Sequence, residues 1–456
     1  MPRPTSASAY RTQPLATEHL PPGIAFIVAN EAAERFSYYG MRTILVVFMT
    51  QYLTNAQGQL APLSEASAQG YYHLFLAMAY ITPLLGALLA DGLWGKYRTI
   101  IALSFVYCLG HFVLALDTTL TGLLLGQTLI ALGAGGIKPC VSAHVGDQFC
   151  HHNQHLLSRV FSWFYFAINL GAVIAMLLMP WLLARHGAHT AFAVPGLLML
   201  LATLIFWLGR RRYCHIRPQG RIFIRQIVSR QGLATLARLG RIYIFIALFW
   251  ALFEQTGSSW VLQAAKMDRE LFGLTLLPSQ IQASNPLLIL LLTPLFAYYI
   301  YPFWQRHLPL TPLTKMRTGL VLTALAFLVS ALIQSRIDQG GHPSILWQLL
   351  AYLLLTSAEV MVSITCLEFS YTQAPKTMKA WIMAFFYLAI AAGNLFTSLV
   401  NFSLDALFAD RQTLSAGYFW FFAGLMLITA LLFNRFSRDF ILESHLQDGH
   451  SPPPSL

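Results

Sequence analysis

The fold of this chain is decided by the stretch Asn30-Glu31-Ala32-Ala33-Glu34-Arg35-Phe36-Ser37-Tyr38-Tyr39-Gly40-Met41-Arg42. It places four charged residues in a run that otherwise predicts a membrane-spanning helix. Side chains spaced by three, four or seven residues share one face of a helix. A polar stripe is therefore expected, made of Glu31, Arg35, Tyr38 and Arg42, with Glu34 and Tyr39 beside it. A charged side chain in mid-membrane costs at least about 2.5 to 3.5 kcal/mol, so these groups should pair and face a wet interior pathway.

The composition is that of an integral membrane protein. Of the 456 residues, 56% are hydrophobic and 10% are charged, against about 25% charged in a typical soluble domain. The net charge of +11 does not predict nucleic-acid binding, because the basic residues lie between apolar runs and form no soluble patch with aromatic residues. The odd number of cysteines, five, implies no disulfide framework. Residues 1–22 lack a signal-peptide pattern, so the first span is expected to direct insertion.

Twelve apolar runs are long enough to cross a bilayer, which takes about 20 residues each. Six lie in residues 23–209 and six in residues 242–437, and the intervening segment 210–241 carries nine arginines and no acidic residue. We therefore predict an all-α integral membrane protein with two six-helix bundles. The expected divisions are a tail at 1–22, a bundle at 23–209, a basic linker at 210–241, a bundle at 242–437 and a tail at 438–456.

Orientation follows from the basic residues, because positively charged loops stay in the cytoplasm. Both tails and the linker are expected on that side. The linker could be read as an RNA-binding arm, but its position between two sets of spans favours a segment lying along anionic lipid headgroups. Its apolar runs are short, which predicts twelve spans and not fourteen.

The pattern Glu31-x-x-Glu34-Arg35-Phe36-x-Tyr38-Tyr39-Gly40 resembles the signature of the proton-dependent oligopeptide transporters, a family within the major facilitator superfamily. The resemblance covers roughly residues 25–439. It implies the major facilitator fold and proton-coupled symport of di- and tripeptides by alternating access. It also implies a bacterial inner membrane location, function as a monomer, and no cofactor beyond the coupling proton. The short loop 336–343 leaves no room for the large extracellular domain of animal relatives.

His73 and Tyr80 lie two turns apart on one face of the second span. The unperturbed pKa of histidine, about 6.5, suits a proton switch, while a buried packing residue is the alternative for His73. The resemblance implies the switch, because animal peptide transporters have a coupling histidine at the matching position.

Asp91 ends this span, and Lys96 and Arg98 begin the next one. This loop is similar to a motif shared by major facilitators and is expected to join neighbouring helices or to act in gating, although an ordinary charged turn is the other interpretation.

Lys138 lies within a glycine-rich part of the fourth span and needs a partner. The glycines at 133–136 could suggest a dinucleotide-binding loop, but no strand precedes them, so close helix packing is expected. The residues Cys150, His151, His152 and His155 have no standard metal-site spacing, and no metal is expected.

Asn169 lies in a segment, 164–171, that resembles a second signature of the family. Its buried amide could form hydrogen bonds with the peptide group of a substrate, or it could form a hydrogen bond with a neighbouring helix.

In the second bundle, Glu254 is the one carboxylate of its span and is the strongest proton-site candidate. We expect a Glu254–Arg42 ion pair that breaks during the cycle. Glu359 lies in the tenth span and also needs a cation, for which Lys138 is the candidate, so this pair is expected to tie the bundles together. The resemblance places Asn285 in the pocket. Phe386 stands where family members usually have tryptophan, which keeps an apolar wall but removes an indole donor.

The combined prediction is a symporter in which Arg35 and Lys138 hold the substrate carboxylate while Glu359 receives the amino end. Every short peptide carries opposite terminal charges at a nearly fixed separation, so such a cavity would accept many side chains. The remaining pocket residues are expected to be Tyr38, Tyr39, Tyr80, Asn169, Trp250, Asn285, Ser363 and Phe386. Proton coupling and gating are assigned to Glu31, Glu34, Arg42, His73, Glu254 and Asp91.

Three other functions compete with this interpretation. A related transporter of nitrate or another small anion would keep the basic residues but would not need Glu359. A membrane-embedded hydrolase is disfavoured because no Ser-x-x-Lys, His-Glu-x-x-His or nucleophile-elbow motif occurs. A receptor that binds peptide without transporting it remains open. The expected partners are peptides and membrane lipids, without nucleic acid.

Overall fold

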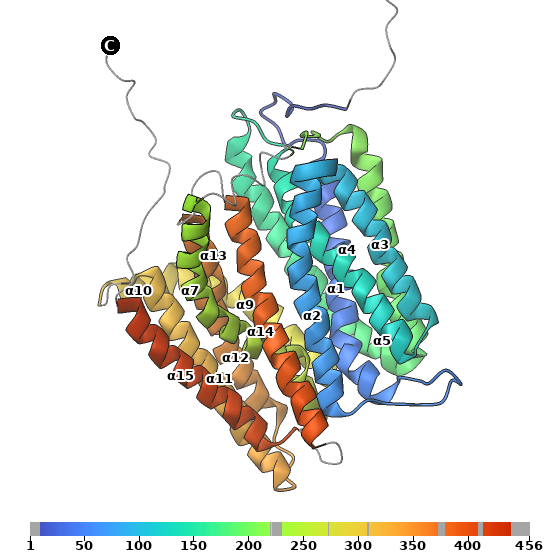
Figure 1. The fold of residues 1–456 in the computed structure, drawn as a ribbon, viewed down its shortest axis with the longest axis vertical. Coiled ribbons are helices and arrows are strands. Elements are labelled where there is room, and N and C mark those ends of the chain that lie inside the picture. Colours follow the sequence, from blue (N-terminus) through green and yellow to red (C-terminus); the bar gives the residue numbers. More distant parts are fainter. Residues whose placement is uncertain are drawn as a thin grey trace, which may run out of the picture.

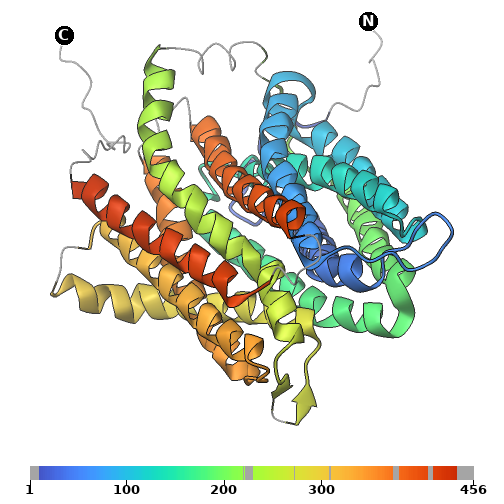
Figure 2. The same ribbon diagram turned by 60° about the horizontal axis from the view of Figure 1, so that its bottom comes forward.

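The computed structural model describes residues 10–218, 220, 230–271, 273–307, 310–372, 379–408 and 414–438. Long helices form two groups that stand side by side (Figures 1 and 2). The first group consists of α1 (Ile24–Gln51), α2 (Glu65–Ala87), α3 (Lys96–Leu116), α4 (Leu120–Gly146) and α5 (Leu157–Leu208). The second consists of α7 (Arg230–Phe253), α8 (Ser259–Ala265), α9 (Ser284–Leu295), α10 (Tyr301–Gln305), α11 (Pro312–Asp338), α12 (Ile345–Glu359), α13 (Thr365–Thr372), α14 (Lys379–Leu407) and α15 (Ala416–Arg438).

The predicted twelve spans are confirmed within the described residues. Ten helical stretches are long and apolar enough to cross a membrane. α1 has the length of 28 residues but carries four charges, which lower its apolar character. α5 contains two spans, because Gly187 breaks its 52 residues with φ 76° and ψ 179°, a left-handed conformation that favours glycine. The described residues therefore form two bundles of six spans. Part of the predicted basic linker 210–241, namely residues 219 and 221–229, lies outside the described residues.

Three spans of the second bundle are interrupted. A 3-10 turn, Glu254–Gly257, separates α7 from α8, and π-helical turns at Phe296–Ile300 and Val360–Ile364 lie between α9 and α10 and between α12 and α13. Two short antiparallel strands, β1 (Glu270–Leu271) and β2 (Leu274–Thr275), follow α8. Such breaks in a regular helix often mark functional positions. Glu254, Glu359 and Ser363 all lie in or beside one of them.

The outer faces of both bundles are apolar. Phe105, Phe112 and Leu197 have 58%, 60% and 66% of their surface exposed. Soluble monomers rarely expose large contiguous apolar areas, whereas lipid tails cover such faces in a membrane. The exposed faces and the apolar helices together show a membrane protein.

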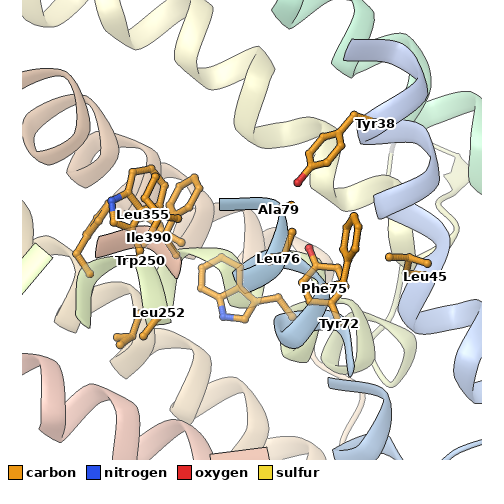
Figure 3. Close-up of a cluster of buried hydrophobic side chains, with 14 of the residues drawn as sticks. Tyr38, Leu45, Tyr72, Phe75, Leu76, Ala79, Trp250, Leu252, Leu355 and Ile390 are labelled. Carbon is orange, nitrogen blue, oxygen red and sulfur yellow. The ribbon is translucent and has the colours of Figure 1, made fainter. Parts of the chain in front are cut away.

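The two bundles approach each other at the lower end of Figure 1, opposite the N-terminal segment 10–23 that precedes α1. One apolar core includes residues of both bundles there. Figure 3 labels Tyr38, Leu45, Tyr72, Phe75, Leu76 and Ala79 of the first bundle and Trp250, Leu252, Leu355 and Ile390 of the second. This shared core includes buried side chains of both bundles and therefore joins them.

Close helix packing explains the glycines of α4, as predicted. A Cβ atom at Gly135 would overlap the Thr82 hydroxyl and would lie 2.5 Å from the Ala79 carbonyl oxygen. A Cβ at Gly86, on α2, would overlap the backbone of Gly136. The backbones of α2 and α4 therefore touch at a point where a side chain cannot fit.

We expect Gly86→Val to lower the stability of the protein, because the added carbons force α2 and α4 apart at a backbone contact. Overpacking of this kind typically costs about 1–3 kcal/mol. The matched control is Gly424→Val in α15, where a Cβ would meet no atom within 4 Å. The midpoint of thermal unfolding in detergent should fall for the first variant and stay near wild type for the second. Equal midpoints would contradict the packing role.

Candidate functional site

The charged stripe of α1 forms ion pairs within the helix, as the sequence predicts. Arg35 Nε lies 3.1 Å from Glu31 Oε1, and a second guanidinium nitrogen contacts the Glu34 carboxylate. All three side chains are buried. The 3.6-residue period of the helix places residues 31 and 35 one turn apart on the same face. Two acids therefore share one arginine inside the first bundle.

The predicted ion pair between Arg42 and Glu254 is present, and it joins the two bundles. Arg42 donates to the Glu254 carboxylate and, through Nε, to the Tyr72 hydroxyl at 2.6 Å. The Tyr80 hydroxyl donates to the other oxygen of Glu254 at 3.3 Å. Both charged residues are buried. The 3-10 turn that begins at Glu254 ends α7, so the carboxylate lies where that span is interrupted.

His73 lies at the same bundle interface and is fully buried. Its Nδ1 is 2.8 Å from Asn394 Oδ1, and its Nε2 is 2.8 Å from Ser258 Oγ. The Asn394 amide nitrogen donates to the Ile390 carbonyl, so its oxygen faces the ring and can only accept. Nδ1 therefore carries hydrogen. Ser258 can donate a hydrogen bond to a neutral imidazole or accept one from a protonated imidazole. The two hydrogen-bond partners of His73 are therefore compatible with both protonation states of its ring.

Further polar contacts join the bundles near the loop between α1 and α2. Ser67 Oγ donates to Asp405 at 2.8 Å, and Lys266 Nζ lies 2.9 Å from Glu65. One more contact is the bond from Gln282 Nε2 to the Thr43 carbonyl, at 3.1 Å. α1 starts beside the tail and runs away from it, so this loop lies at the opposite end of the molecule. These polar contacts thus join the bundles at that end.

The predicted ion pair between Lys138 and Glu359 is wrong for this conformation. Lys138 Nζ lies 4.3 Å and 4.5 Å from the ring centroids of Tyr38 and Tyr80, and an ammonium is attracted to such ring faces. Glu359 instead accepts a hydrogen bond from Asn285 Nδ2 at 2.7 Å. Each charge is stabilised within its own bundle. Both side chains remain partly exposed, so water can solvate them.

Other predicted pocket residues divide into a polar and an apolar group. Tyr39 and Ser363 are partly exposed, and Ser363 lies in the π-helical turn after Glu359. Trp250 and Phe386 are buried with ring centroids 6.4 Å apart, which gives an apolar surface from α7 and α14. Asn169 donates to the Tyr165 carbonyl of its own helix at 2.9 Å. In the described structure, that amide nitrogen makes no bond to a neighbouring helix.

The charged loop between α2 and α3 does join neighbouring helices, but the acid that pairs with Lys96 is Asp147 and not Asp91. Lys96 Nζ binds both carboxylate oxygens of Asp147, at 2.7 and 2.9 Å. Asp147 follows α4 directly, so the bridge joins the start of α3 to the end of α4. Burial raises the pKa of Asp147 above its ordinary value, and the Lys96 charge opposes that rise. Asp91 lies in the π-helical turn Leu88–Trp94 and does not pair with Lys96.

Several contact residues were missed by the sequence analysis. These are Tyr72, Asp147, Ser258, Asn394 and Asp405. A polar residue inside an apolar span was an available signal for Asn394. The other four become visible only when segments distant in sequence come together. Among the described residues, no group of three or more His, Cys, Asp or Glu side chains could hold a metal ion.

Two curated relatives resemble the chain over most of its length, and one of them is named as a peptide transporter. Peptide transporter family 1 of Drosophila melanogaster is 40% identical over 373 residues, which cover 71% of this chain and 49% of the relative. Solute carrier family 15 member 2 of Rattus norvegicus is 36% identical over 418 residues, which cover 80% of this chain and 56% of the relative. The chain therefore spans about half the length of these relatives.

Solved structures match over nearly their whole length. The POT family transporter PepTSo has a TM-score of 0.83 at 35% identity, and the match covers 92% of this chain and 99% of that one. An auto-inhibited POT family peptide transporter has a TM-score of 0.83 at 34% identity, with coverage of 93% and 98%. The family model PTR2, described as the POT family, matches residues 97–236 and 225–410. By its sequence and by its fold, the chain belongs to the POT family.

Proposed function

We propose that this protein is a proton-coupled symporter that imports di- and tripeptides by alternating access. The observation that carries the proposal is the pair Lys138 and Glu359. They have opposite charges, they come from opposite bundles, both are partly exposed, and they are not bonded to each other. A zwitterionic peptide has a carboxylate for the first and an ammonium for the second. The name of the Drosophila melanogaster relative and the description of the auto-inhibited peptide transporter structure support this substrate class.

The remaining residues would complete the recognition of the peptide. Arg35 and Lys138 would hold the carboxylate, while Glu359 and Asn285 would hold the amino end. The polar side chains of Tyr38, Tyr39, Tyr80, Asn169 and Ser363 would bond the peptide backbone, and Trp250 with Phe386 would contact its side chains. Phe386 provides an apolar surface without a donor, so it would not discriminate by hydrogen bonding.

Protons would act at the bundle interface and in the α1 stripe. Glu254 holds Arg42 only while it is ionised, so protonation would weaken the contact between the bundles. His73 also bridges the bundles, and its two partners accept either protonation state. Glu31 and Glu34 share Arg35 in the first bundle and would respond when a substrate carboxylate approaches that guanidinium. Asp91 would act in gating through the adjoining turn.

We further propose a multi-pass location in the plasma membrane, a bacterial inner membrane, with both tails in the cytoplasm and function as a monomer. Arg210, Arg211 and Arg212 lie at the tail end of the first bundle, which the positive-inside rule places in the cytoplasm. The end at which the polar contacts join the bundles would then face outward, which supports a conformation closed to the outside. In this conformation a substrate would enter or leave on the cytoplasmic side.

The decisive test is uptake of radiolabelled dialanine by proteoliposomes under an imposed pH gradient, acidic outside. The expected result is accumulation above the external concentration, abolished when the gradient is collapsed. Accumulation of nitrate without dialanine would identify an anion transporter instead. Binding of dialanine without any accumulation would identify a receptor.

In the same assay, we expect Lys138→Ala and Glu359→Ala each to abolish measurable uptake. Each variant removes a charge-assisted contact worth about 1.5–3 kcal/mol, which corresponds to roughly a 10- to 100-fold loss of affinity, so uptake at tracer dialanine concentration should fall to background. Lys315→Ala is the matched control for the lysine, because Lys315 also lies over a tyrosine ring, at 4.2 Å from Tyr301, but in the second bundle. Glu368→Ala is the control for the acid, since Glu368 is exposed. Wild-type uptake by either charge variant would contradict the assignment.

For Glu254→Gln, we expect loss of gradient-driven accumulation with retention of peptide counterflow. The amide resembles a permanently protonated acid, so the empty carrier cannot reset by losing a proton, whereas exchange of one peptide for another needs no reset. Both rates are measured in the same proteoliposomes, with Glu270→Gln on the exposed strand β1 as the control. If Glu254→Gln still accumulates peptide against its gradient, the coupling site lies elsewhere.

His73→Gln should preserve uptake at low pH but shift the pH optimum. The amide can keep a hydrogen bond to Asn394 or to Ser258, but it cannot titrate. The measurement is initial uptake rate against external pH for the wild type, for this variant and for His342→Gln, an exposed histidine. An unchanged pH profile would leave His73 with a packing role.

A further inference from the structure

A cavity of about 630 Å³ lies at the tail end of the first bundle, away from the bundle interface. Three segments that are distant in sequence form most of its walls, and His144 of α4 with Leu93 and Trp94 completes them. The three segments are the N-terminal residues Tyr10 and Thr12, the start of α3 at residues 95–98, and the segment 215–218 that follows α5. In Figure 1 the N-terminal segment crosses this end of the bundle. None of these walls belongs to the proposed peptide site.

The cavity is basic. Its lining includes Lys96, Arg98 and Arg217 together with two histidines, and it contains no carboxylate side chain. Asp147 neutralises Lys96, but the side chains of Arg98 and Arg217 are exposed and have no ion pair in the described structure. Two positive charges are therefore available to a ligand in one cavity.

Two groups deeper in the cavity also favour an anion. Gly95 precedes α3 with φ 80°, and no side chain caps the first backbone N–H groups of that helix. The N-terminal end of a helix carries a partial positive charge and unpaired N–H groups. His144 also lines the cavity, is only 1% exposed, and its Nε2 has no hydrogen-bond partner. A buried polar atom without a partner is costly, so this nitrogen is available to bond an oxygen-rich ligand.

The N-terminal wall is held in place by contacts with residues 212–215, of which His215 also lines the cavity. The His215 backbone N–H donates to the Arg11 carbonyl at 2.7 Å, and the Arg11 guanidinium donates to the Arg212 carbonyl at 3.3 Å. The rings of Tyr10 and His215 have centroids 4.4 Å apart. Burial lowers the pKa of His215, and the charge of Arg98 acts in the same direction. Arg98, His215 and the N-terminal segment therefore form one connected wall.

We propose that this cavity binds the phosphate group of an anionic phospholipid. Arg98 and Arg217 would pair with the phosphate, and His144 and the start of α3 would donate hydrogen bonds to its oxygens. The same chemistry would fit free phosphate. A lipid is favoured because Leu93 and Trp94, at the rim, are 67% and 47% exposed, and the start of a membrane span is at headgroup level. These apolar side chains would contact the acyl chains.

The test is native mass spectrometry of the full chain purified in detergent and titrated with dioleoylphosphatidylglycerol or with dioleoylphosphatidylcholine. The wild type should retain one molecule of the anionic lipid at concentrations where it retains none of the zwitterionic one. The double variant Arg98→Gln with Arg217→Gln should bind the anionic lipid about 30-fold more weakly. The matched control is Arg435→Gln with Arg438→Gln, which removes two arginines from the end of α15 on the same side of the molecule.

Folding is checked by the thermal unfolding midpoint and by size-exclusion elution of each variant. His144→Phe, which keeps a ring but removes the nitrogen, supplies a second variant and should also weaken lipid binding. Equal retention of the anionic lipid by wild type and the arginine double variant would overturn the proposal. Binding of inorganic phosphate alone, without selectivity between the two lipids, would overturn the lipid as the source of the phosphate.

Discussion

The structure depends on how buried charge is neutralised between two apolar bundles, and the ion pair of Arg42 with Glu254 is the central case. Each partner would be strongly destabilising alone in this environment, because removing one leaves an unpaired buried charge. Tyr72 and Tyr80 satisfy further hydrogen-bonding capacity of the pair. The contact therefore stabilises one relative position of the bundles, but only while the carboxylate is ionised.

The polar interface and the apolar core cooperate at the same end of the molecule. The side chains shown in Figure 3 exclude water there, and exclusion of water strengthens each electrostatic contact. His73, Asn394 and Ser258 form a second polar bridge in that region. Two polar bridges, each of which includes an ionisable side chain, therefore join the two bundles.

Lys138 and Glu359 show the opposite arrangement, because these two charged side chains do not pair with each other and both are partly exposed. The tyrosine rings hold the ammonium and the Asn285 amide holds the carboxylate, so neither charge requires the other. A direct ion pair between them would join the bundles and neutralise both groups. Its absence from this conformation leaves both charges available to a zwitterionic ligand.

The sequence by itself determined the membrane class, the twelve spans, the family and the α1 charges, because apolar length and residue spacing along one helix are local properties. It also suggested the Arg42–Glu254 pair, through the family resemblance and the lack of another carboxylate in that span. Only the tertiary structure decided that Lys138 lies over two tyrosine rings, that Lys96 forms an ion pair with Asp147, and that His73 forms a hydrogen bond with Asn394. These partners come from distant segments, and which charge a side chain reaches depends on helix rotation and bundle separation that no local pattern specifies.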